Sequence, residues 1–235
     1  MPNRCFDTEI FDTASVRRQS GDPYLIMPQT SAEHSMDQSK RITIFDPLLQ
    51  QVRDCKACVS LLPHAPRPIV QLDPRAKILI ASQAPGRKAH ESGIPFRDAS
   101  GERLRRWLGI SDDDFYDAHK VAILPMGFCY PGYGKSGDLP PLPQCAAAWH
   151  QQLLPYLSGI ELTLLIGQYA QAYHLGARHR SVTHNVQAWQ QFWPDIVPLP
   201  HPSPRNGIWL RKNAWFELEV IPQLQARVAS ILQSV

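Results

Sequence analysis

The sequence predicts an α/β protein, a three-layer α/β/α domain around a central four-stranded parallel sheet. Short apolar runs alternate with amphipathic stretches along residues 42–235, which is the pattern of buried strands and the helices that cover them. The length of 235 residues suits one domain with a substantial core. Right-handed crossovers between such strands make the sheet parallel and place helices on both of its faces.

The elements follow one another in a regular order. Four apolar runs are expected as buried strands, over residues 77–82, 120–124, 161–166 and 196–199. Helical patterns lie near residues 46–53, 101–108, 145–157, 168–175 and 186–192, and from 213 to the end. Because ligands bind at the carboxyl ends of the strands in such sheets, the loops that follow the strands are the first places to look for function.

The first 41 residues differ from the rest. Residues 1–40 show no sustained period of 2 or 3.6 and are rich in Ser, Thr, Gln, Asp and Pro, so we expect a flexible extension over 1–41 and a globular domain over 42–235. The segment 1–40 has a net charge of −2, which leaves +5 for the remainder. A mild positive excess suits a polyanionic partner.

The chain lacks the marks of a membrane or secreted protein. No apolar run approaches the roughly 20 residues of a membrane helix, and the N-terminal MPNRCFDTEIFD has no basic region followed by an apolar stretch. We therefore expect a cytoplasmic protein with no membrane partner. Its five cysteines would then stay reduced, which favours metal binding or chemistry over disulfides.

The loop after the first strand, residues 82–96, mixes polar groups around one aromatic ring, with a turn fixed by Pro85 and Gly86. It lacks the G-x-x-x-x-G-K-[ST] spacing of a phosphate-cradling loop, which argues against a nucleoside triphosphatase. The loop continues to Asp98 and Ser100, either of which is a good N-cap for the next helix.

The loop after the last strand reads Leu199-Pro-His-Pro-Ser-Pro-Arg205. Prolines on both sides of His201 and Ser203 stiffen it, since each proline fixes its own φ and restrains the residue before it. Such rigidity is useful where an imidazole must be aimed at a substrate.

Four cysteines form two pairs, Cys55-x2-Cys58 and Cys129-x15-Cys145. Four thiolates in a reducing compartment suit an iron-sulfur cluster or a structural zinc ion. The alternative is that they are four ordinary core residues with no metal.

Taken together, these motifs resemble the uracil-DNA glycosylase superfamily, especially its bacterial iron-sulfur branches, families 4 and 5. The resemblance rests on the first Cys pair, on Ser82-Gln-Ala-Pro-Gly86 through Gly93-Ile-Pro-Phe96, on the second Cys pair around a Pro-rich loop, and on His201-Pro-Ser203. The order and spacing of these parts agree over about residues 46–228.

The resemblance implies a monofunctional glycosylase that removes uracil or a related deaminated base from DNA after flipping the nucleotide out of the duplex. A monomer is the default expectation for a protein that scans DNA. It implies that Ser82, Gln83, Ala84, Pro85 and Gly86 contact the base and position water. Phe96 would stack on the base, and His201 would stabilise the negative charge that develops on it. Ser203 and Arg205 would hold a flanking phosphate, helped by Lys135. Cys55, Cys58, Cys129 and Cys145 would hold a [4Fe-4S] cluster, with zinc or no metal as the alternatives.

The chain also departs from the family pattern. Gln83 stands where family 4 has Glu, Ala84 where the main-branch enzymes carry their catalytic Asp, and Pro125 where the family has a base-reading Asn. A cleavage through a cation-like sugar needs a carboxylate nearby. The candidates are Asp98, whose segment resembles the G-D-A-S-G segment of family 5, and Glu91, of which Asp98 is preferred.

Two other functions remain open at this point. One is a non-catalytic protein of the same fold that binds damaged or single-stranded DNA. The other is a zinc-stabilised α/β protein that acts on a nucleotide or a small molecule.

Overall fold

The computed structural model describes residues 38–135 and 137–233. The first helix, α1 (Gln38–Arg53), begins four residues before the expected domain boundary. The rest of the expected extension lies outside the described residues.

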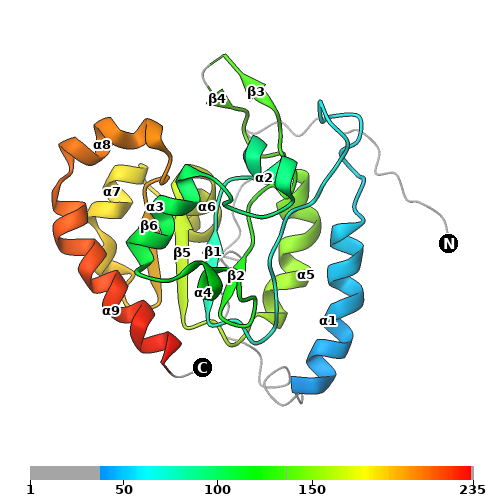
Figure 1. The fold of residues 1–235 in the computed structure, drawn as a ribbon, viewed down its shortest axis with the longest axis horizontal. Coiled ribbons are helices and arrows are strands. Elements are labelled where there is room, and N and C mark those ends of the chain that lie inside the picture. The colour runs from blue at the N-terminus through cyan, green and yellow to red at the C-terminus, as the bar shows by residue number, and fades with distance from the viewer. Residues whose placement is uncertain (1–37, 136, 234–235) are drawn as a thin grey trace.

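The core is a four-stranded parallel sheet, which confirms the predicted fold class (Figure 1). Its strands are β1 (Ile78–Ala81), β2 (Val121–Ile123), β5 (Leu162–Ile166) and β6 (Ile196–Leu199), in the spatial order β2-β1-β5-β6. All four fall inside the predicted apolar runs. Pro198 is tolerated because β6 is an edge strand, where a missing backbone donor costs least.

Helices cover both faces of the sheet. Alternate strand residues such as Ile78 and Ile80 face one core, which is closed by α3 (Ala99–Leu108) and α9 (Ile221–Leu232). Leu79 faces the other core, closed by α1 and by the helical stretch of residues 146–156. Two-sided burial is why these strands read as continuous apolar runs.

Several elements differ from the sequence prediction. Three short helices were not expected, and they are α2 (Arg87–Ser92), α4 (Asp112–Tyr116) and α8 (Gly207–Lys212). The helix α6 (Gly167–Leu175) agrees with prediction, whereas α7 (Val182–Gln187) begins before the predicted 186–192. A hairpin of β3 (Tyr133–Gly134) and β4 (Gly137–Asp138) lies in the Pro/Gly-rich loop, where no strand was expected.

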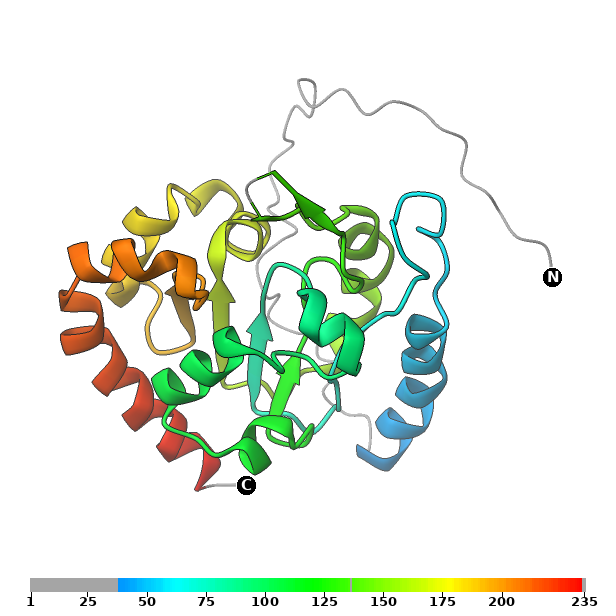
Figure 2. The same ribbon diagram turned by 45° about the horizontal axis from the view of Figure 1, so that its top comes forward.

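The topology places a crevice near the centre of the sheet. The chain passes from β1 to β2 on one side, and then returns to pair β5 with the opposite side of β1. Such a switch point is where ligands bind in open parallel sheets. Helix α2 and the β3–β4 hairpin both lie beyond the carboxyl ends of the strands at this place (Figures 1 and 2).

No helix in the described part of the chain is long and apolar enough to cross a bilayer.

Candidate active site

A cavity of about 300 Å³ opens at the carboxyl ends of the strands. It brings together most of the residues that the sequence singled out. Its lining includes residues 82–86 of the first loop, Phe96, Asp98, His201, Ser203 and Arg205.

The first loop is fixed to the neighbouring strand connection by its backbone. The carbonyl of Ser82 accepts the amide of Met126 at 2.8 Å, and the carbonyl of Gln83 accepts the amide of Gly127 at 2.9 Å. Ser82 itself is buried, with 4% of its surface exposed. This wall of the cavity is therefore held by the same kind of bonds that hold the sheet.

Phe96 is placed by an unusual backbone conformation. Its φ of 54° lies in the left-handed region, which side-chain-bearing residues seldom adopt. Its carbonyl oxygen packs so closely on Gly101 that any Cβ there would overlap it. The ring meets Phe115 edge to face at 6.0 Å, so the aromatic wall of the cavity has little freedom.

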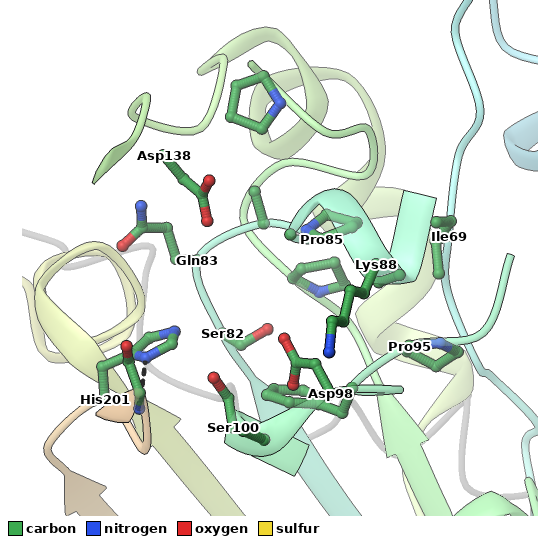
Figure 3. Close-up of a pocket in the computed structure, with 18 of the residues that line it drawn as sticks. Ile69, Ser82, Gln83, Pro85, Lys88, Pro95, Asp98, Ser100, Asp138 and His201 are labelled. Carbon is green, nitrogen blue, oxygen red and sulfur yellow. Dashed lines mark hydrogen bonds between the residues drawn. The ribbon is translucent and has the colours of Figure 1, made fainter. Parts of the chain in front are cut away.

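Asp98 has two roles at once. It is the N-cap of α3, and its Oδ1 accepts the amide of Gly101 at 2.9 Å. Its Oδ2 lies 3.8 Å from the point that a Cβ on Gly86 would occupy, on the cavity side. The capping bond thus fixes the carboxylate while one oxygen faces the cavity (Figure 3).

Glu91, the second candidate carboxylate, lies elsewhere. It belongs to α2, its side chain is 63% exposed, and its Oε1 lies 3.8 Å from Nε of Arg87. It does not line the cavity. The geometry therefore favours Asp98 over Glu91.

The hydrogen bonding of His201 fixes its tautomer. Its Nδ1 accepts the backbone amide of Ser203 at 3.1 Å, so the neutral ring carries its proton on Nε2. Burial lowers the pKa of His201 below its usual value, while the nearby carboxylates of Asp98 and Asp138 act in the opposite direction. At neutral pH the ring is an uncharged donor in the cavity wall.

The loop that carries His201 is clamped from two sides. Nη1 of Arg103, on α3, donates to the carbonyls of Pro202 at 3.2 Å and Ser203 at 3.0 Å. The side-chain amide of Asn206 donates to the carbonyl of His201 at 2.7 Å. The rigidity that the prolines predict for this loop is thus increased by side-chain hydrogen bonds that the sequence did not predict.

The three expected phosphate contacts lie apart. Ser203 lines the cavity, and its hydroxyl accepts the amide of Arg205 at 3.3 Å. Arg205 turns onto the hairpin, where its Nη2 donates to the hydroxyl of Tyr133 at 3.1 Å and its guanidinium lies 5.6 Å from that ring's centre. Lys135 is exposed at the hairpin and does not line the cavity.

Pro125 lines the cavity at the position where the family has an Asn, and offers no side-chain donor. Its carbonyl accepts Nε2 of the fully buried His150 at 3.0 Å. Burial lowers the pKa of His150 to about 4. A neutral histidine therefore supports the back of the cavity.

Two charged groups in the cavity escaped the sequence analysis. Asp138, at the end of the hairpin, and Lys88, on α2, both point into it (Figure 3). The loop that holds Asp138 has no periodic pattern, and the sequence predicted a function only for its Cys pair and for Lys135. No spacing in the sequence signals that residue 138 approaches residue 98.

The four cysteines come from three parts of the chain and lie near one another. The thiol of Cys145 is hydrogen-bonded to the sulfur of Cys58, and the pKa values of Cys58, Cys129 and Cys145 are each raised by burial and by the nearby Cys55. Burial raises the pKa of Cys129 to about 11 and that of Cys145 to about 12. Within residues 38–135 and 137–233, no group of three or more His, Cys, Asp or Glu side chains is arranged to hold a metal ion. The donor chemistry suits a cluster, but the thiols are not assembled as a finished metal site.

Comparison of the sequence with known protein families finds a match over the same region. The family model of the Uracil DNA glycosylase superfamily matches residues 69–225. The match runs from before β1 into the first part of α9, and it includes every residue that lines the cavity.

Proposed function

The chain belongs to the uracil-DNA glycosylase superfamily, and on that premise we propose that it hydrolyses the N-glycosidic bond of uracil or a related deaminated base in DNA. Membership by itself supports a glycosylase-type hydrolase with DNA as its substrate. The observation that supports the finer proposal is the cavity, in which Asp98, His201 and Phe96 meet at the carboxyl ends of the strands.

In this proposal the base enters the cavity after it has left the helical stack. Phe96 stacks on its face, because the ring is held firmly at the cavity wall. When the C1′–N bond breaks, its electron pair stays on the base, and the Nε2–H of His201 donates to the oxygen that gains charge. A donor that is already aimed need not reorganise during the reaction.

Asp98 acts on the sugar side. As the bond breaks, the sugar becomes cation-like, and a carboxylate both offsets this charge and orients the attacking water. The oxygen Oδ2 of Asp98 faces the cavity, while Oδ1 is held by Gly101.

The test is an excision assay on oligonucleotides that carry a single uracil, hypoxanthine or xanthine, with release of free base measured by chromatography. We expect release from at least one of them by the native protein. Asp98→Asn is the matched control, because Asn caps a helix as well as Asp does but carries no charge. No release from any substrate would contradict the proposal.

One observation favours a second candidate, a protein of the same fold that binds damaged or single-stranded DNA without cleaving it. The family's catalytic and base-reading positions are Ala84 and Pro125 in this chain, and both line the cavity without offering a polar side chain. Tight binding of lesion-containing DNA without release of base would support this candidate.

We also propose that Cys55, Cys58, Cys129 and Cys145 bind a [4Fe-4S] cluster. The proposal is supported by four thiols from distant segments that lie close enough to influence one another. The cluster would tie the end of α1 to the two ends of the loop 129–145 that carries the hairpin. No catalytic step requires it.

The cluster is tested by iron and acid-labile sulfide analysis of protein purified without oxygen. We expect about four of each per chain, and their loss in Cys58→Ser. One zinc per chain, or no metal in native protein, would overturn the cluster and support the corresponding alternative.

A further inference from the structure

Asp138 is a cavity residue to which neither the family resemblance nor the proposed reaction gives a role. It ends β4, and its side chain enters the cavity from the side opposite Asp98 (Figure 3). Its carboxylate accepts a hydrogen bond from the hydroxyl of Tyr130, which is itself 3% exposed. The exposed carboxylate is thus aimed by a buried neighbour.

Asp98 and Asp138 converge on one point above Gly86. A Cβ placed on Gly86 would lie 3.6 Å from Oδ2 of Asp138 and 3.8 Å from Oδ2 of Asp98. The backbone of Gly86, with φ of −80° and ψ of 176°, suits any residue. The lack of a side chain there leaves open the space between the two carboxylates.

The position of Asp138 relative to Arg205 indicates which part of a nucleotide it would meet. Arg205 packs directly against Gly137, the residue before Asp138, and its guanidinium, which also lines the cavity, suits a flanking phosphate. In a nucleotide the sugar lies between the base and the phosphate. A carboxylate at the cavity mouth, beside the phosphate-binding side chain, therefore meets the sugar.

We propose that Asp138 is a catalytic residue that faces the deoxyribose and shares with Asp98 the stabilisation of its cation-like state, with the attacking water held above Gly86. The C1′–N bond breaks and its electron pair leaves with the base. The water oxygen forms the new bond to C1′, and its proton passes to Asp98 and then to solvent. Asp138 forms no covalent bond in this step, and the products are free base and abasic DNA.

This assignment rests on the proposed function, but it can be tested without turnover. The probe is duplex DNA with a pyrrolidine abasic analogue, whose ring nitrogen is protonated, compared with a neutral tetrahydrofuran abasic analogue in the same sequence. Because transition-state mimics bind at least about 10²-fold more tightly than ground-state ligands, we expect the native protein to prefer the cationic probe by tenfold or more, about a tenth of that limit.

Asp138→Asn should reduce that preference by about tenfold, which is roughly the effect of one charge-assisted interaction, and leave tetrahydrofuran affinity within about twofold. Asn can still accept the Tyr130 hydrogen bond, so the hairpin keeps its contact. Gly86→Ala is the second variant, since it adds a methyl group between the carboxylates without backbone strain, and should also reduce the preference. Glu102→Gln is the matched control, because Glu102 is exposed in the first turn of α3 and does not line the cavity.

The outcomes separate this assignment from the proposed function. An unchanged preference in Asp138→Asn, or no preference in the native protein, overturns the role of Asp138, whether or not base is released. A native protein that prefers the cationic probe through Asp138 but releases no base overturns the excision proposal and leaves Asp138 as the residue that faces the sugar.

Discussion

The two sides of the cavity are built by different means. The side that carries Asp98 and His201 is held by backbone hydrogen bonds, a helix cap and the Arg103 clamp. The side that carries Asp138 is a two-stranded hairpin attached through side chains, chiefly Arg205 on Tyr133. The difference teaches that Asp98 and His201 are aimed by backbone and helix-end contacts, whereas Asp138 is aimed by the side-chain contacts of its hairpin.

Removal of the charge at Asp98 should have the largest effect and would show that the rigid side carries the chemistry. We expect Asp98→Asn to lower the single-turnover excision rate about 10³-fold, while the melting temperature and DNA affinity stay close to native. Rapid-quench assays measure the rate, scanning calorimetry the melting temperature and titration calorimetry the DNA affinity. An excision rate within about threefold of native, far from the loss expected of a general base, would transfer the role of Asp98 to another carboxylate.

His201 comes next on the rigid side. His201→Ala should lower excision about 10²-fold, the usual cost of losing one donor to developing charge.

Because burial lowers the pKa of His201 and only the neutral ring keeps its bond from Ser203, we expect activity to persist below pH 6.5, the usual histidine pKa, before it falls. Asp138→Asn removes a charge that raises this pKa, so the acid limb should move to lower pH. A pH–rate profile whose acid limb lies above pH 6.5 would contradict the neutral ring proposed for His201.

Acid should also weaken the support behind the rigid side. His150 has a folded pKa of about 4, against about 6.5 when unfolded. The unfolded chain therefore binds the proton first, and the stability from neutral burial is present above pH 6.5 and lost as the pH falls toward 4. At pH 5 the loss is about 2 kcal/mol for this residue.

Urea unfolding at pH 7 and pH 5 measures this loss, with His150→Gln as the matched variant. The variant should lose less stability than the native protein over the same interval, because Gln does not titrate. Equal losses in both proteins would show that His150 does not carry the acid sensitivity.

A smaller effect is expected on the hairpin side. Tyr133→Ala removes the ring beneath Arg205, an interaction of about 0.5–1 kcal/mol. We expect KM to rise about threefold while the single-turnover rate at saturating DNA is unchanged. Tyr133→Phe, which keeps the ring and loses only the hydroxyl, should lie between. A fall in the single-turnover rate instead would show that the Arg205–Tyr133 contact also positions Asp138 for the chemical step.

The smallest effect belongs to Lys135, which is exposed and outside the cavity. Lys135→Ala should weaken binding about twofold regardless of the base and reduce the slope of log affinity against log salt by about 1. An unchanged salt slope would remove Lys135 from the DNA-binding surface.

The sequence by itself determined the sheet and much of the cavity. Each strand was predictable as an apolar run, because a strand that is buried on both faces has few polar positions. The loops with Ser82 and His201 were located in advance because both follow strand ends, and parallel strands end at one edge. The sequence favours Asp98 over Glu91 as the catalytic carboxylate but keeps both as candidates, since both lie in or next to the same loop.

Tertiary structure alone decided the rest. Helix α2 is too short for a helical period to be visible, and the β3–β4 hairpin lies in a Pro/Gly-rich segment without alternation. Asp138 and Asp98 line the same cavity only because the β2–β5 connection reaches the carboxyl end of β1. Contacts of this kind depend on how distant segments of the chain pack together, and a local pattern of residues does not predict that packing.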